Sequence, residues 1–376
     1  MVTSPANLIR INVHRARGCS SRVRSMFMPT KGVVVAPADD GAAVEALCTE
    51  RVGNRPIVCH ALDALVSAGT TELAVVAPPR ALEAIRTCIE SDGSASATVR
   101  YVGQTSRPDL LGSLEAAASF VGDDPAVVHL ADGLVGDTAD RFSRLLVERP
   151  EGLVLLVHRS SDKHAGLGPA TERLLGVTEL NGSRSRLAVA GVCVFGPHLL
   201  RLASAAPAGS DRPCDLIAVA EWLASQGHQP QVGFVQTWRQ YRGNSLDLLE
   251  LNRLVLDQHS PEAEPVDSGD NRIEGRVSIH PTAQLRSSVI VGPSIIGPGA
   301  RISNSFVGPY TSIGARAEIE GAEVERSIIA DGARIMHVSG RIEGSTIGQR
   351  ARIFRDFALP RGLRLHIGAN AEMAFS

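Results

Sequence analysis

The chain has 376 residues, of which 21% are charged, and its formal net charge is −2 at pH 7. This near-neutral balance creates no overall field that would attract nucleic acid or an anionic membrane, so neither is expected as a partner. The 6 cysteines lack CxxC spacing, which argues against a zinc site or disulfide framework and favours the reducing cytoplasm. No apolar run approaches the roughly 20 residues that a membrane helix needs.

The first 30 residues differ from the rest of the chain in charge. Residues 1–27 contain arginines at five positions and no acidic residue. This composition is compatible with a targeting tail. A start at Met26 or Met28 explains it more simply, and residues 1–30 are interpreted as a disordered N-terminal extension.

Residues 31–257 alternate short apolar runs with helix-like segments. The strand patterns VVVA, ELAVVAP and PAVVHLADG are separated by the helical patterns PIVCHALDALVSAG and ALEAIRTCIES. This order predicts an α/β domain with a doubly wound, mixed parallel sheet and helices on both faces. Further strands are expected at GLVLLVH and LAVAGVCVF, and further helices at DLIAVAEWLASQG and NSLDLLELNRLVLD.

A different pattern follows the polar, proline-bearing residues 258–275, which are interpreted as a linker. Residues 276–376 carry a hexapeptide repeat, in which a six-residue step would send one aliphatic side chain of each short strand inward and turn at a small residue. The pattern predicts a C-terminal left-handed parallel β-helix. The inward positions include Ile296, Ile302, Val307, Ile313 and Ile319.

The order of these two halves resembles the sugar-1-phosphate nucleotidylyltransferases, in particular the long form of glucose-1-phosphate thymidylyltransferase. The resemblance is carried by GNRPIVCHALDALVSAG, GDDPAVVHLADGLVGD, SLDLLELNRLVLD and most of the hexapeptide region. It implies a nucleotidyltransferase-like domain over residues 31–257. It also implies a reaction in which a nucleoside triphosphate and a sugar 1-phosphate give an NDP-sugar and pyrophosphate, with Mg²⁺ as the cofactor.

Two residues match the family's functional positions. Asp132 in LADG matches the aspartate that binds Mg²⁺ beside the phosphates, a role that suits hard carboxylate oxygens, although a turn or cap after a strand is the alternative. Gln104 in YVGQ falls where the family reads the nucleotide base with a side-chain amide. His129 and Trp238 are interpreted as packed core in preference to a metal ligand and a stacking platform.

The expected phosphate-binding loop departs from the family pattern. The family's GGxGTRLxP segment should lie at residues 36–47, which read APADDGAAVEAL. Only Gly41 remains there to bring backbone amides close to phosphate. Asp39 and Asp40 would repel a triphosphate, since two like charges ~4 Å apart at an effective dielectric of about 20 cost about 4 kcal/mol.

The family's cationic and second metal positions are also altered. Its lysine after the loop has no counterpart, and its second metal aspartate falls at Tyr241. Because Lys31 and Lys163 are the only lysines of the chain, Arg51 and Arg55 are the candidates to hold the phosphates.

Three functional hypotheses therefore stay open. The first is a sugar-1-phosphate nucleotidylyltransferase with impaired activity or an altered substrate. The second is a catalytically degenerate regulatory or scaffold subunit that binds a sugar nucleotide or an active sister subunit. The third and most remote is a hexapeptide-repeat acyltransferase with His280, His337 or His366 as its base.

Because the coil edges of a β-helix need cover, a homo-oligomer or a complex with a sister subunit is expected.

Overall fold

A computed structural model describes residues 31–36, 43–93, 98–104, 107, 109–136, 152–160, 167–177, 186–207, 215–258, 269–355 and 363–366. The predicted extension at residues 1–30 and the loop residues Asp39, Asp40 and Gly41 lie outside the described residues. By their internal contacts the residues form two units. The first comprises Met1–Thr49 and Pro56–Gln240, and the second comprises Glu50–Arg55 and Tyr241–Ser376.

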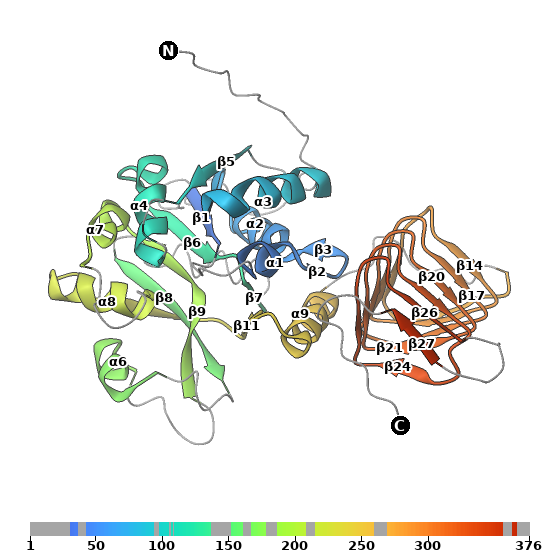
Figure 1. Cartoon of the computed structure of the whole chain (residues 1–376). Coiled ribbons are helices and arrows are strands. Elements are labelled where there is room, and N and C mark those ends of the chain that lie inside the picture. Colours follow the sequence, from blue (N-terminus) through green and yellow to red (C-terminus); the bar gives the residue numbers. More distant parts are fainter. Residues whose placement is uncertain are drawn as a thin grey trace, which may run out of the picture. The chain divides into compact units, whose positions relative to one another are not determined.

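The first unit is built on a 7-stranded sheet of order β10-β8-β9-β6-β1-β4-β5 (Figure 1). β9 runs antiparallel to both of its neighbours, and the other pairings are parallel. The expected mixed sheet is therefore confirmed. Its strands are β1 (Lys31–Val35), β4 (Glu72–Ala77), β5 (Thr98–Gly103), β6 (Ala126–Leu130), β8 (Leu153–Ser160), β9 (Arg186–Phe195) and β10 (Gln231–Phe234).

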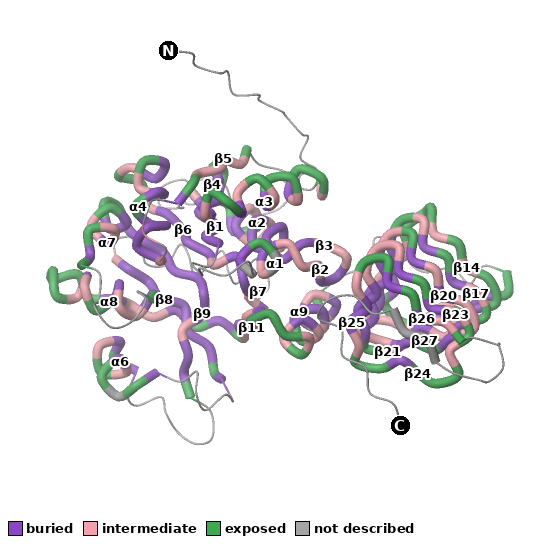
Figure 2. The backbone as a smooth tube through the Cα atoms, in the orientation of Figure 1, coloured by how far each residue is buried: buried purple, intermediate pink, exposed green. Residues whose placement is uncertain are grey.

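Helices cover both faces of this sheet because its central strands are apolar on both sides. In β1, Val33 and Val35 pack into one core cluster, and Val34 packs into the other. Figure 2 shows β6, β8 and β9 as largely buried. The first face carries α4 (Leu110–Val121), α7 (Leu199–Ser204) and α8 (Leu216–Ser225), and the second carries α1 (Ala43–Thr49), α2 (Ile57–Ser67) and α3 (Pro79–Asp92).

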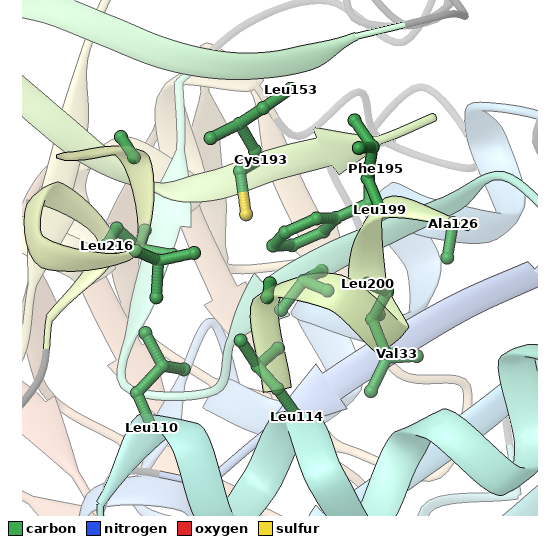
Figure 3. Packing of buried hydrophobic residues seen from close by; sticks show 14 of the residues in the cluster. Val33, Leu110, Leu114, Ala126, Leu153, Cys193, Phe195, Leu199, Leu200 and Leu216 are labelled. Atoms are coloured by element: carbon green, nitrogen blue, oxygen red, sulfur yellow. The ribbon is translucent and has the colours of Figure 1, made fainter. Parts of the chain in front are cut away.

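The core of the first face gathers around one aromatic ring. Figure 3 shows the ring of Phe195 among Leu114, Leu200 and Val33. Phe195 is completely buried at the end of β9, so the antiparallel strand contributes to the same core as the parallel strands. A short helix, α6 (Pro169–Leu174), lies between Leu167 and Leu175, and both of these leucines are buried in this core.

A two-stranded antiparallel sheet follows β6. It pairs β7 (Gly133–Val135) with β11 (Trp238–Gln240) in a register that sets Gly133 opposite Gln240. A Cβ atom at Gly133 or at Gly191 would stand 2.3 Å from Cζ2 of Trp238. The indole therefore fills the space that these two glycines leave, and the interpretation of Trp238 as core packing is confirmed.

The second unit contains three sheets of short strands, each with neighbours one coil apart. Arg272, Val289, Phe306 and Glu323 are paired in succession at intervals of 17 residues, and Ile290, Ile302 and Ile313 are buried in one aliphatic core. Three stacks of parallel strands around one aliphatic core fit the predicted β-helix, and its left-handed sense stays a prediction.

The strands of these sheets begin earlier than the composition suggests. β12 starts at Arg272, inside the segment interpreted as a linker. At the other end, β27 pairs antiparallel with β26. The three sheets contain β12 (Arg272–Glu274), β15 (Val289–Val291), β18 (Phe306–Val307), β21 (Glu323–Glu325) and β24 (Arg341–Glu343); β13 (Val277–Ile279), β16 (Ser294–Ile296), β19 (Thr311–Ile313), β22 (Ile328–Ile329) and β25 (Thr346–Ile347); and β14 (Gln284–Arg286), β17 (Arg301–Ser303), β20 (Glu318–Glu320), β23 (Arg334–Met336), β26 (Arg352–Arg355) and β27 (Leu363–His366).

Residues outside the hexapeptide region also belong to the second unit. They include α9 (Ser245–Gln258) and the turn Glu50–Arg55, which contains β2 (Arg51–Val52) and the start of β3 (Arg55–Pro56). The contacts thus group α9 with the β-helix, whereas the change in sequence pattern lies after this helix, at Asp257. No described helix has both the length and the hydropathy to cross a membrane.

Candidate functional site

Four strands of the first unit end side by side at one edge of the large sheet. Beyond the strand ends, the backbone N–H of Ala36 donates to the carbonyl oxygen of Val76, that of Ala131 donates to Val35, and that of Gln104 donates to Ala77, each at 2.8 Å. β1 lies between β4 and β6. The chain places β4 and β5 on one side of β1 and later places β6 on its other side, so the strand order reverses at β1. In open α/β sheets, ligands bind outside the carboxyl ends of the strands at such a reversal.

Asp132 lies at this edge, directly after β6 and Ala131. It is only 4% exposed, and its Oδ2 accepts a hydrogen bond of 2.7 Å from Nε2 of Gln240. The register of β7 with β11 makes this bond possible, because Gln240 is opposite Gly133, the residue after Asp132. The residue that faces Asp132 is therefore Gln240, one position before the Tyr241 to which the family resemblance assigns the second metal aspartate.

Gln104 follows β5 at the same edge and is also buried. Its Nε2 donates to the backbone oxygen of Asp109 at 2.8 Å. Asp109 is the N-cap of α4, and its Oδ1 accepts from the backbone N–H of Gly112 at 2.9 Å. The amide of Gln104 is thus fixed by the start of a helix, so that its oxygen is the atom suited to contact a ligand.

His129 is packed in the core beside this edge. Nδ1 lies 2.7 Å from the carbonyl oxygen of Leu130, and the ring centroid is 5.5 Å from that of Trp238. Burial lowers the pKa of His129 to about 4, which makes the ring neutral, with Nδ1 as the donor to the carbonyl. The interpretation of His129 as a core residue is confirmed.

Arg239 is a cation at this edge that the sequence analysis did not single out. It is half-buried on β11, between Trp238 and Gln240, and within the described part of the chain it forms no ion pair. His158, near the carboxyl end of β8, has its pKa lowered by burial and additionally by the positive charge of Arg239. The first unit therefore places a positive charge close to the ends of β6 and β8.

The predicted phosphate-binding arginines belong to the other unit. Arg51 and Arg55 flank the turn Gly53 and Asn54, and Nη1 of Arg51 donates to the backbone oxygen of Asn54 at 2.8 Å. Their proposed contact with phosphate stays a prediction.

Lys31 is committed to a structural contact at the opposite edge of the sheet. It begins β1, and its Nζ donates to the backbone oxygens of Phe120 at 2.9 Å and Val121 at 3.1 Å. Nζ also pairs with the carboxylate of Asp124 at 2.8 Å. A cation at the last carbonyls of a helix stabilises its C-terminal end. Lys31 is thus unable to serve the carboxyl edge, and Lys163 lies outside the described residues.

Asp132 could supply one carboxylate oxygen to the magnesium ion that the family resemblance implies. Mg²⁺ is commonly held by one or two carboxylates together with substrate phosphates, and the hydrogen bond from Gln240 engages only Oδ2 of Asp132, so that Oδ1 lies outside this contact. No group of three or more His, Cys, Asp or Glu side chains that could hold a metal ion occurs among the described residues.

Comparisons with known proteins give three relatives that extend over both units. The chain is 28% identical over 330 residues to a glucose-1-phosphate thymidylyltransferase of Streptomyces griseus, covering 86% of this chain and 92% of the relative. It is 29% identical over 327 residues to a glucose-1-phosphate thymidylyltransferase of Streptomyces antibioticus, covering 86% and 91%. It is 27% identical over 343 residues to the low-salt glycan biosynthesis nucleotidyltransferase Agl11 of Haloferax volcanii, covering 86% and 92%. No family model matches the chain.

Proposed function

Because this chain resembles the sugar-1-phosphate nucleotidylyltransferases over 86% of its length, we propose that it binds a nucleotide or sugar nucleotide at the carboxyl edge of its large sheet and that nucleotidylyl transfer there is slow or lost. The binding of a ligand is supported by Asp132 and Gln104, which follow β6 and β5 at the same carboxyl edge of the sheet, with β1 and β4 between them. The impaired chemistry is supported by Gln240, because the side chain that faces Asp132 is an amide and not a second carboxylate.

The reaction of the family explains why the loss of charge matters. An oxygen of the sugar 1-phosphate attacks the α-phosphorus of a nucleoside triphosphate, the bond from that phosphorus to the bridging oxygen breaks, and pyrophosphate leaves with the electron pair. Such a step depends on positioning and on neutralising phosphate charge. The first unit offers Arg239 for this purpose, while Lys31 is engaged at the opposite edge.

Each retained residue has a distinct role in the proposed complex. The oxygen of Gln104 would accept a hydrogen bond from the base, since its Nε2 is already held by Asp109. Arg239 would contact a phosphate through its guanidinium, which carries several fixed donors. Asp132 would accept a hydrogen bond from a hydroxyl group of the sugar or ribose, since hydrogen bonds to an ionised carboxylate are strong.

The test measures binding and turnover separately in the full chain. Calorimetry with dTTP, dTDP-glucose and glucose 1-phosphate should show saturable binding of at least one nucleotide. Pyrophosphate release from dTTP and glucose 1-phosphate should be at least ~10³-fold slower than that of an active thymidylyltransferase assayed in parallel, because the loss of one charge-stabilising donor has an effect of about this size. Rapid formation of dTDP-glucose would contradict the proposal that nucleotidylyl transfer is slow or lost. The absence of all nucleotide binding would overturn the proposed function.

The β-helix supports a second candidate, a subunit that regulates or organises an active sister enzyme. In the described part of the chain, β12, β13 and β14 pair on one side only. Unpaired strand edges readily accept another chain. Light scattering of the full chain, alone and mixed with an active thymidylyltransferase, tests this candidate: a dimer or a mixed complex supports it, and a concentration-independent monomer in both samples contradicts it.

A further inference from the structure

We infer that the β-helix carries a binding surface for a linear acidic polysaccharide, which runs along the helix axis and bears an acidic group on every second sugar. The surface consists of two pairs of arginines, Arg301 with Arg316 and Arg334 with Arg350, and is called the arginine strip below. All four residues belong to the second unit. None of them lies at the carboxyl edge of the large sheet, so the inference does not depend on the proposed function.

One arginine of each pair lies on the stack that contains β14, β17, β20, β23 and β26 (Figure 2). Arg301 on β17 and Arg334 on β23 occupy equivalent positions, because each is paired in register with Glu318 of β20. The carboxylate of Glu318 lies 3.2 Å from Nη1 of Arg301 and 3.1 Å from Nε of Arg334. The two arginines are thus two coils apart, which is about 10 Å at the usual strand spacing, and one glutamate holds both of them.

The other arginine of each pair comes from the corner of the following coil. In four successive coils this corner has a positive φ, which is 67° at Gly299, 55° at Arg316, 69° at Gly332 and 57° at Arg350. A Cβ atom at Gly299 would stand 3.4 Å from Cγ of Arg316, and one at Gly332 would stand 3.4 Å from Cγ of Arg350. Each corner arginine therefore lays its stem over the glycine that precedes the strand arginine of its pair by two residues.

The corner arginines have a backbone conformation that glycine adopts more easily. Residues with a side chain are uncommon at positive φ, and arginine is not among the types that are enriched there. Gly299 and Gly332 show that glycine fits the same corner in the neighbouring coils. The turn itself does not explain Arg316 and Arg350, and such a conformation is a reason to look for a function.

The arginine strip also keeps more of its charge than another corner of the β-helix does. Arg326, which has a positive φ as well, pairs with Glu343. Arg316 and Arg350 are exposed and form no ion pair within the described part of the chain. A carboxylate does lie at the same corner, that of Asp331, but its Oδ1 accepts a hydrogen bond of 2.8 Å from a backbone N–H. The strip therefore has a net positive charge.

The spacing of the two pairs determines the kind of ligand. A guanidinium can bind a carboxylate through two parallel N–H···O bonds, so each pair offers a site for one acidic group. A sugar ring with its glycosidic oxygen lengthens an extended polysaccharide by about the height of one coil. An acidic group on every second sugar would therefore meet both pairs. Nucleic acid carries its phosphates much closer together, so that most of them would lie between the two sites.

The experiment uses the full chain and hyaluronan oligosaccharides as the probe, since in this polysaccharide a sugar with a carboxylate alternates with a neutral one. Calorimetry at low salt compares oligosaccharides with one, two and three carboxylates. Affinity should rise by at least about 10-fold when the second carboxylate is added, because a further hydrogen-bonded charge pair forms, and by less than about 3-fold with the third. Added salt should weaken the binding.

The informative variant combines Arg316→Gly with Arg350→Gly. Because glycine adopts a positive φ without strain, its melting temperature should equal or exceed that of the wild type, whereas affinity for the oligosaccharide with two carboxylates should fall by at least about 10-fold. Arg326→Gly is the matched control: this arginine has a φ of 46° and is paired with Glu343, and its loss should change the affinity by less than about 2-fold. A purely structural role of the corner arginines predicts the opposite, a lower melting temperature with unchanged affinity.

Three outcomes would overturn the inference. The first is that the wild type binds none of the hyaluronan oligosaccharides. The second is that polyphosphate or a thymidine oligonucleotide of equal charge binds as tightly, since the strip would then attract anions regardless of their spacing. The third is that the glycine variant binds like the wild type. If the glycine variant does not fold, Arg316→Gln combined with Arg350→Gln preserves most of each stem, and the same loss of affinity is required of it.

Discussion

Asn252 and Gly53 are 199 positions apart in the chain, and Oδ1 of Asn252 accepts a hydrogen bond of 2.8 Å from the backbone N–H of Gly53. The same oxygen accepts from the hydroxyl of Ser312 at 2.7 Å, and Nδ2 donates to the backbone oxygen of Tyr310 at 3.1 Å. One buried side chain therefore joins the Glu50–Arg55 turn, α9 and a coil of the β-helix. This connection explains why residues 50–55 belong to the second unit.

Asn252→Ala should destabilise the second unit by about 2–4 kcal/mol, because buried donors and acceptors lose their partners. Thermal and urea unfolding of the full chain measure this change. Leu246→Ala on the same helix is the control, since Leu246 is 72% exposed and should alter stability by less than about 0.5 kcal/mol. Equal effects of the two substitutions would show that the hydrogen bonds of Asn252 do not hold the unit together.

A second prediction concerns the packing of the Trp238 indole ring against Gly191. Gly191→Ala would place a Cβ atom 2.3 Å from Cζ2 of the indole, and overpacking of this kind costs about 1–3 kcal/mol. Gly168→Ala is the matched control in the same unit, because a Cβ atom there meets no atom within 4 Å. Urea unfolding measures both, and near-ultraviolet circular dichroism should change for Gly191→Ala only. An unchanged tryptophan spectrum together with full stability would refute this packing.

The buried histidine predicts a pH dependence of stability. The pKa of His129 falls from 6.5 to about 4 on folding, so the unfolded chain binds more protons between these values. The contribution of His129 is complete above about pH 6.5 and is lost as the pH falls toward 4, which amounts to about 2 kcal/mol between pH 7 and pH 5. His158, whose pKa is also lowered, acts in the same direction.

His129→Gln should reduce this dependence and leave the part due to His158. The measurement is the free energy of unfolding in urea at several pH values between about 5 and 7. The substitution also removes a core ring, so its overall loss of stability is expected and carries no information. Only the slope with pH does, and a slope identical to that of the wild type would mean that His129 is not the titrating group.

The elements that the sequence predicts well are those with local signals. The run VVVA and the spacing of Ile296, Ile302 and Ile313 depend on neighbours within a few residues, and they correspond to β1 and to three strands of the β-helix. Asp132 and Gln104 could also be placed, because each directly follows a recognisable strand.

The rest of the site depends on contacts between distant segments. Gln240 reaches Asp132 across 108 positions through the pairing of β7 with β11, and no local pattern encodes this pairing. The glycine in QYRG aligns this segment with the family so that Tyr241 stands where the second metal aspartate is expected. In the structure, the packing of Trp238 fixes the register of β11, and the residue that faces Asp132 is Gln240, one position earlier. In the same way, the grouping of Arg51 with the β-helix unit follows from Asn252 and not from its own neighbours.

The last prediction assigns the phosphate contact to Arg239. This guanidinium is half-buried beside Gln240 and forms no ion pair with the described residues, so a bound phosphate would supply its missing counter-charge. Arg239→Gln should weaken dTDP binding by about 10-fold or more, since a hydrogen bond to a charged group contributes about 1.5–3 kcal/mol. Its free energy of unfolding should change by less than about 0.5 kcal/mol.

Lys31→Gln provides the opposite pattern in the same assays. It removes a cation from the far edge of the sheet, where Nζ holds the last carbonyls of α4, and should lower stability by about 1–2 kcal/mol without changing the affinity for dTDP. Calorimetry at two salt concentrations sharpens the contrast, because the loss of a phosphate contact also reduces the salt dependence of binding. If Arg239→Gln binds dTDP as tightly as the wild type, the phosphates are held elsewhere, and Arg51 and Arg55 become the residues to replace.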